Sequence, residues 1–128
     1  MVSKLAAFDT SEDGFRTVVE DYQERALRVL WRSPGGLNSR EVWLKVNEAL
    51  GPDGNGISRA SIINFLEFMR LRGVLRGIDR TGKGGHYWIY VAEMGESEFK
   101  RYVAKYVIAK LFETWPDATK EAIEEIFR

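Results

Sequence analysis

The segment that most constrains the fold is residues 57–92, where a short helix-forming stretch leads directly into two β-rich runs. Ser58 is of a type that caps the first turn of a helix, and Gly73 stands where a glycine commonly ends one. The β-rich runs, residues 74–79 and 86–92, flank a glycine-rich stretch that is typical of a turn. This order predicts a capped helix followed by a β-hairpin.

The helix expected after Ser58 has two distinct faces, and residues 51–56 before it are a turn by composition. At about 100° per residue, apolar side chains gather on one side. The residues expected in the core are Ile62, Phe65, Leu66 and Met69. The residues expected to point outward are Ala60, Ile63, Asn64 and Glu67.

Two further helices are expected before this segment. Thr-Ser-Glu-Asp at 10–13 resembles a capping box, and apolar residues then recur at helical spacing up to Trp31. Ser-Pro-Gly-Gly at 33–36 ends this helix, because the residue before a proline disfavours helical backbone. Asn38 is expected to cap the second helix, with Glu41 reaching back to it. Its predicted inner face consists of Val42, Val46, Ala49 and Leu50.

Two helices are also expected after the hairpin. The first runs from a Ser97 cap through Trp115, and the second opens at Pro116 and ends near Arg128. Apolar residues surround much of the long helix, so it needs cover on two sides, and a second copy of the chain is the simplest cover. The side chains predicted to pair the subunits are Phe99, Val103, Tyr106, Val107, Leu111, Phe112, Trp115, Ile123 and Phe127.

Charge is distributed unevenly along a chain whose formal net charge is zero. Residues 25–92 contain eleven lysines and arginines against five aspartates and glutamates, a net charge of +6. Residues 1–24 carry a net charge of −4, and residues 93–128 carry one of −2. A basic module between acidic flanks is the electrostatic footprint expected of a nucleic-acid binder.

Composition argues against several other classes of protein. The sequence has no cysteine, which rules out disulfides, thiolate metal sites and cysteine nucleophiles. Its one histidine, His86, has no second histidine or cysteine to help it bind a metal. Without a phosphate-binding glycine loop or a hydrolase motif, we expect neither catalysis nor a cofactor. No apolar run suits a signal peptide or a membrane span, which predicts a cytoplasmic protein.

A narrow helix beside a positive ribbon is suited to double-stranded DNA, with the helix in the major groove and the ribbon on phosphate. Asn64 suits bidentate pairing with adenine, and serine hydroxyls can bond base edges or phosphate. Glu67 would repel phosphate from the outward face unless it accepted from a cytosine amino group. The predicted DNA contacts are Ser39, Arg40, Ser58, Arg59, Ala60, Ser61, Asn64, Arg76, Arg80, Lys83 and His86.

Three short motifs, in their order and spacing, carry a resemblance to a known family. They are Ala-Leu-Arg-Val-Leu-Trp at 26–31, Ser-Arg-Glu-Val at 39–42 and Ser-Ile-Ile-Asn at 61–64, followed by Leu66, Met69, Gly73, Gly85, Trp88, Ile89 and Tyr90. In these residues the chain resembles the penicillinase-repressor family of winged-helix transcription repressors, over about residues 22–92.

The resemblance implies a mainly α-helical fold with a small β-hairpin, divided into two parts. Residues 1–92 would form a winged helix-turn-helix DNA-binding domain with an N-terminal extension, and residues 93–128 a helical dimerisation region. It implies a homodimeric, sequence-specific repressor that binds an inverted-repeat operator. A regulator of this kind would answer to an effector, which the sequence does not identify.

Two other functions remain open. The apolar residues Ile63, Phe68 and Leu71 would suit a module that binds a partner protein, and the same charges would suit a DNA binder without sequence preference. Binding of single-stranded nucleic acid, with its bases stacked on the aromatic residues, is disfavoured because the spacing of these residues indicates a core or an interface. Trp43 is the exception, with no clear inward position, and is assigned to the dimer or to the duplex backbone.

Overall fold

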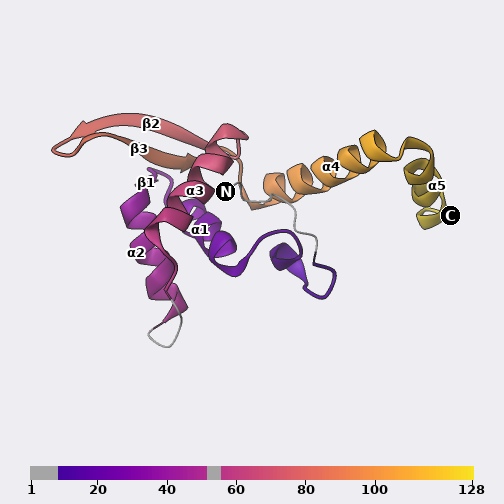
Figure 1. The fold of residues 1–128 in the computed structure, drawn as a ribbon, viewed down its shortest axis with the longest axis horizontal. Helices are drawn as coiled ribbons and strands as arrows, with labels where there is room; N and C mark the ends of the chain where they lie inside the picture. The colour runs from indigo at the N-terminus through magenta and orange to yellow at the C-terminus, as the bar shows by residue number, and fades with distance from the viewer. Residues whose placement is uncertain (1–8, 52–55) are drawn as a thin grey trace.

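The structure is a computed structural model that describes residues 9–51 and 56–128. Its described elements form a mainly helical fold with one small antiparallel sheet (Figure 1). In chain order they are the 3-10 helix η1 (Gly14–Thr17), α1 (Asp21–Trp31), β1 (Leu37–Asn38), α2 (Ser39–Leu50), α3 (Arg59–Leu71), β2 (Leu75–Gly82), β3 (Gly85–Ala92), α4 (Glu96–Thr114) and α5 (Pro116–Ile126). The turn predicted at 51–56 includes positions 52–55, which lie outside the described residues.

The core of the fold is built around α3, as the sequence predicts. Ile62, Phe65, Leu66 and Met69 are each at most 1% exposed. They pack in one cluster with buried residues of α1 and α2, including Leu27, Leu30, Val42 and Val46. Ala49 does not belong to this cluster and is exposed, which corrects the prediction for the last turn of α2. The α3 helix is capped by Ser58, and Gly73 follows it with a φ of 81°.

The hairpin is longer and tighter than the two predicted runs. β2 pairs antiparallel with β3 from Leu75 opposite Ala92 to Gly82 opposite Gly85, so the turn narrows to Lys83 and Gly84. β1 adds a short third strand on the other side of β3, which the sequence did not predict. Gly36 makes this approach possible, because a Cβ there would lie 2.7 Å from the Tyr90 carbonyl oxygen.

The predicted first helix is in fact two elements. Gly14 has a φ of 66° and begins the short helix η1, and regular helix starts only at α1. At that start the Gln23 side chain accepts a hydrogen bond from the Glu20 backbone N–H at 2.9 Å, which caps the helix. The bend between the two elements carries Phe15 into the core, where its ring lies 5.6 Å from that of Trp31.

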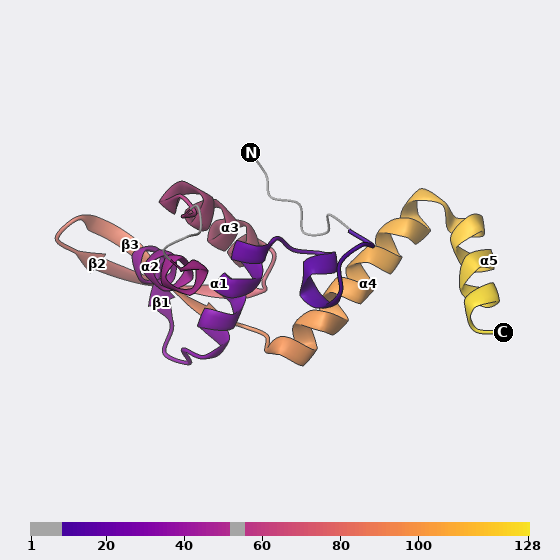
Figure 2. The same ribbon diagram turned by 90° about the horizontal axis from the view of Figure 1, so that it is seen from below.

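The last two helices project from the core. The cap of α4 lies at Gly95 rather than the predicted Ser97, because Glu98 accepts from the Gly95 N–H at 3.2 Å. Its first turns pack on the core, and the rest extends away until α5 turns to a new direction (Figures 1 and 2). The hairpin tip and α5 therefore lie at opposite ends of the molecule. Among the described residues, none of the helices combines the length and apolar character needed to cross a membrane.

Candidate functional site

The start of α3 has an exposed side, and Ser58 and Ser61 there are occupied by the helix cap. The Ser58 Oγ accepts from the Ser61 N–H at 3.1 Å, and the same hydroxyl donates to the Ser61 Oγ at 2.9 Å. Arg59, Ala60 and Asn64 are exposed. Within the part of the chain that the structure describes, no hydrogen bond or ion pair holds the Arg59 or Asn64 side chain. Two polar side chains at this end of α3 are therefore free to bind another molecule.

Helix α2 is held against the start of α3 by two side chains. The Trp43 Nε1 donates to the Ile57 carbonyl at 2.8 Å, and the Asn47 side chain accepts from the Ile57 N–H at 2.8 Å. Trp43 is therefore a structural residue, which corrects its assignment to a dimer or duplex surface. The predicted cap of α2 is confirmed, with the Asn38 side chain accepting from the Glu41 N–H at 2.8 Å. At the same helix start, Arg40 is exposed and Ser39 half-buried.

A network of polar side chains joins α3 to the hairpin. The Arg70 guanidinium donates two hydrogen bonds to the Glu67 carboxylate, at 3.0 and 2.9 Å, and the Tyr90 hydroxyl donates to it at 2.6 Å. The guanidinium also lies 4.6 Å from the centre of the Trp88 ring. Gly77 leaves room for this stacking, because a Cβ there would lie 2.7 Å from the Arg70 Cδ.

This network corrects the expectation of a free outward carboxylate at Glu67. The hydrogen bonds from Arg70 lower the pKa of Glu67, and burial raises that of the Tyr90 hydroxyl. Glu67 is therefore ionised, and the positive charge of Arg70 balances its negative charge. Its side chain is about one-third exposed. The spacing of Glu67 and Arg70, three residues apart on one helix, is the sequence signal that would have revealed the pair.

The predicted basic residues of the hairpin are exposed but differ in their partners. Arg76 lies 3.5 Å from the Glu93 carboxylate, and Arg80 donates to the Asp79 carbonyl at 3.0 Å. His86 pairs with the Asp79 carboxylate, and its ring meets Trp88 edge-on at 5.1 Å. Lys83, at the tip, has no such partner in residues 9–51 and 56–128. Arg76 and His86 thus have carboxylate partners, Arg80 has a carbonyl partner, and Lys83 has none among the described residues.

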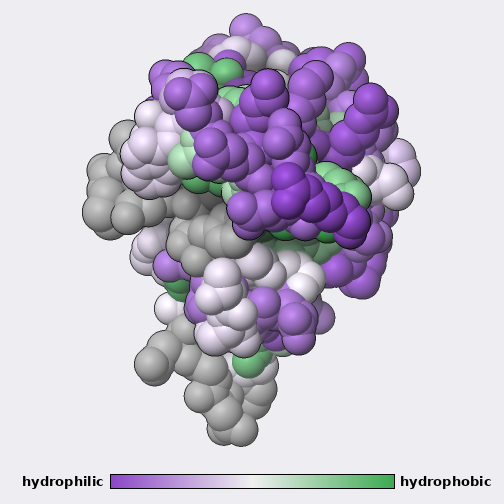
Figure 3. All heavy atoms as spheres, turned by 90° about the vertical axis from the view of Figure 1, so that its right-hand side faces the viewer, coloured by the Kyte–Doolittle hydropathy of each residue, from purple (hydrophilic) through white to green (hydrophobic). Residues whose placement is uncertain are grey.

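The predicted subunit contacts fall into three groups by burial. Phe99 is fully buried, so it completes the core of this chain and leaves no surface for a partner, which corrects its assignment. Val103 is 8% exposed and packs mainly in the same core, which corrects its assignment to a subunit surface. Tyr106, Val107 and Ile123 are half-buried. The exposed members are Leu111, Phe112, Trp115 and Phe127, with Trp115 60% and Phe127 83% exposed. Seen from the α5 side, hydrophilic side chains dominate the surface, with apolar patches open between them (Figure 3).

The start of α3 and the hairpin belong to one packed unit, whereas six of the nine large apolar side chains that are exposed among the described residues lie between Ile108 and Phe127. In the described parts of the chain, no group of histidine, aspartate and glutamate side chains has the arrangement of a metal site. No protein-family model matches the sequence, and no curated protein matches it significantly.

Proposed function

We propose that the chain is a sequence-specific DNA-binding transcription regulator that acts as a homodimer in the cytoplasm. The observation that carries this proposal is the exposed side of the first two turns of α3, where Arg59 and Asn64 are free, on the same unit as a hairpin carrying exposed cations. A helix of this kind would enter the major groove, and the cations would contact phosphate. The net charge of +6 over residues 25–92 favours DNA as the ligand.

The order of elements supports a winged helix-turn-helix in this region. A helix, a short strand, two helices and a hairpin follow one another from α1 to β3. This is the arrangement that the resemblance to the penicillinase-repressor family implies, with α3 as the reading helix and the hairpin as the wing. The network around Glu67 would fix the angle between them, so that both contact one duplex together.

The C-terminal arm, which we define as residues 108–128, supports the dimer. Ile108, Leu111, Phe112 and Trp115 expose apolar surface along it, and Phe127, directly after α5, adds to it. Exposed apolar surface that gathers in one region commonly marks an interface. A dimer with two-fold symmetry would place two reading helices on successive half-sites of an inverted repeat. Repression is the outcome that the family resemblance favours.

Selection of bound fragments from a pool of random duplexes tests the proposal. We expect enrichment of an inverted repeat whose half-site centres lie about 10 base pairs, or a multiple, apart. Binding with no enriched sequence would instead indicate an architectural DNA binder. Recovery of no DNA at all would contradict the proposal and favour a protein-binding module.

The surface available to a protein-binding module is small in the structure. Leu71 is 75% exposed, but Phe68 is half-buried with the Arg72 guanidinium 4.5 Å from its ring centre, and Ile63 is half-buried. Of the three apolar residues predicted for this alternative, only Leu71 is fully open. DNA binding therefore remains the better supported function.

A further inference from the structure

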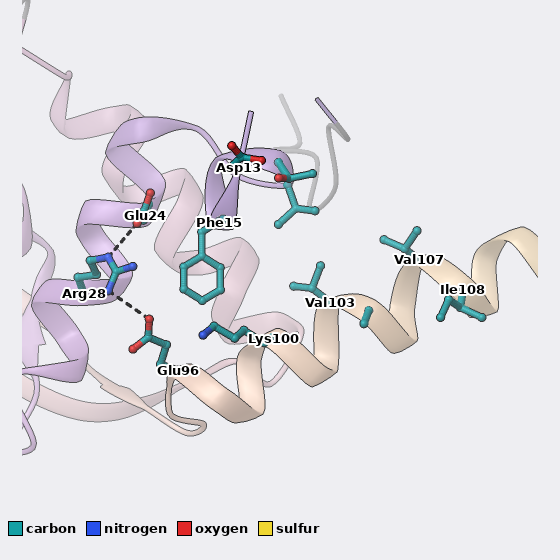
Figure 4. A pocket seen from close by; sticks show the side chains of 13 residues that line it. Asp13, Phe15, Glu24, Arg28, Glu96, Lys100, Val103, Val107 and Ile108 are labelled. Atoms are coloured by element: carbon teal, nitrogen blue, oxygen red, sulfur yellow. Dashed lines mark hydrogen bonds and ion pairs between the residues drawn. The ribbon is translucent and has the colours of Figure 1, made fainter. Parts of the chain in front are cut away.

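A cavity of about 620 Å³ opens between η1, α1 and α4 (Figure 4). Its apolar lining comes mainly from Phe15 and Val18 on one side and from Val103, Val107 and Ile108 on the other. Small-molecule sites commonly have volumes of about 300–1,000 Å³, mostly apolar walls and a few polar groups. The cavity therefore has the size and lining of a site for a small ligand.

The charged side chains at one end of the cavity are not equivalent. The Arg28 guanidinium donates to the Glu24 carboxylate at 2.8 Å and to the Glu96 carboxylate at 3.3 Å (Figure 4). The hydrogen bond that Arg28 donates to Glu24 raises the pKa of Arg28, so the guanidinium stays charged and is already engaged by both carboxylates. They close the end of the cavity without offering a free charge to a ligand.

Lys100 differs from these three groups. Its ammonium lies 5.8 Å from the centre of the Phe15 ring, and no carboxylate of the described residues lies within 4.0 Å of it. In Figure 4, Asp13 lies on the far side of Phe15 from Lys100. The Lys100 end of the cavity therefore offers an unpaired cation beside an apolar floor.

We propose that this cavity binds a small hydrophobic monocarboxylate. Its carboxylate pairs with Lys100, and its apolar body covers Phe15, Val103 and Val107. Charge complementarity selects the anion over a neutral molecule of the same shape, and burial of the apolar body supplies most of the affinity. The site needs no DNA, so the proposal stands or falls independently of the function proposed above.

Calorimetric titration of the full chain with octanoate, and with 1-octanol as the neutral probe, tests the proposal. We expect saturable one-to-one binding of octanoate with a dissociation constant of about 1 mM or tighter, which is reasonable for about ten non-hydrogen atoms. Octanol should bind more weakly by about two- to five-fold, since a partly exposed ion pair contributes only modestly.

Two pairs of variants locate the site. Ala104→Trp places a large ring in the cavity and should weaken octanoate binding at least ten-fold, whereas Ala109→Trp, on the same helix but outside the lining, should not. Lys100→Gln should lower the affinity for octanoate to that for octanol. Lys105→Gln should preserve the difference between the two affinities. All four positions are exposed on α4, and circular dichroism checks that each variant folds.

Three results would overturn the proposal. The first is no saturable octanoate binding to the wild-type chain. The second is equal binding by the Ala104→Trp and Ala109→Trp variants. The third is occupation of the cavity by a second copy, shown if Ala104→Trp, but not Ala109→Trp, converts a dimer to a monomer in sedimentation.

Discussion

The two ends of this molecule use the same kinds of apolar side chain in different ways. In α3, Phe65 and Met69 are at most 1% exposed, because α1, α2 and the sheet cover them. In the C-terminal arm, Trp115 and Phe127 are 60% and 83% exposed. Apolar residues at helical spacing therefore predict a helix face that packs against other protein atoms. The surrounding fold decides whether this chain or a partner supplies those atoms.

The largest effect expected from this difference is on stability. Phe65→Ala should lower the free energy of unfolding by about 3–5 kcal/mol, because it removes buried apolar area and leaves a cavity. Phe127→Ala should change the free energy of unfolding by about 0.5 kcal/mol or less, because the ring is already in solvent. Urea denaturation, under conditions where the protein is monomeric, measures both. Similar losses of unfolding free energy in the two variants would contradict the distinction between a buried core and an exposed arm.

The next effect concerns assembly. Trp115→Glu should weaken the proposed dimer by about 30-fold or more, the effect of losing about 2 kcal/mol from a tryptophan at the centre of an interface. Leu71→Glu is the matched control, because Leu71 is 75% exposed but lies on α3. Sedimentation equilibrium measures both dissociation constants. Two results would contradict dimerisation through the C-terminal arm. One is a wild-type chain that stays monomeric at high concentration, and the other is a dimer that only Leu71→Glu disrupts.

A smaller effect is expected at the join between α3 and the hairpin. Glu67→Gln should cost about 1–2 kcal/mol of stability, because the amide is neutral and offers Arg70 one acceptor oxygen in place of two. Tyr90→Phe removes one hydrogen bond and leaves the ion pair, so its cost should be lower. Chemical denaturation at pH 7 compares the two variants. An equal or greater cost for Tyr90→Phe would mean that the ion pair is not the main contact.

The same site predicts a dependence on pH. The pKa of Glu67 is lowered in the folded protein from its ordinary value of 4.5. A lowered carboxylate pKa contributes stability that is fully present above 4.5 and is lost as the pH falls through the folded value. Wild type and Tyr90→Phe should therefore lose more stability than Glu67→Gln on acidification from pH 6 to pH 3. An identical loss of stability in all three proteins would contradict a stabilising role for the ionised Glu67.

Two further variants distinguish the parts of the proposed DNA surface, and neither should affect folding. Lys83→Ala should weaken binding to all duplexes alike and reduce the salt slope by about one, because it removes one phosphate contact. Asn64→Ala should relax the preference at one base position, with a cost of about 1–3 kcal/mol for the preferred sequence. Fluorescence anisotropy with matched and mismatched operators separates the two outcomes. Wild-type behaviour in both variants would place the contact surface elsewhere.

Local signals predict the centre of the fold well. The caps at Asn38 and Ser58 and the inner face of α3 are confirmed, because each depends on a few neighbouring residues. Gly14 lies within a helical apolar pattern that hides it, although its positive φ begins a separate element. β1 has only two residues, which is too short for any periodicity, and its pairing with β3 is a long-range contact.

The candidate site was predictable only in part. Helical spacing placed Asn64 on the exposed side of α3, and the structure agrees. The same spacing placed Glu67 outward but gave no sign of Tyr90, which reaches it from the hairpin. Phe99 was assigned to a partner because the sequence did not show that Phe15 would fold back to lie 5.5 Å from its ring. Contacts between distant segments therefore account for these errors.

The salt dependence of duplex binding tests the central claim most directly. If the exposed cations of α3 and the hairpin bind phosphate, the logarithm of the association constant should fall linearly with the logarithm of salt concentration. Each neutralised phosphate is expected to contribute about −0.9 to this slope. Three or more phosphate-binding cations per protomer therefore give a slope of about −3 or steeper. A slope near zero, or no binding to any duplex at low salt, would contradict the account.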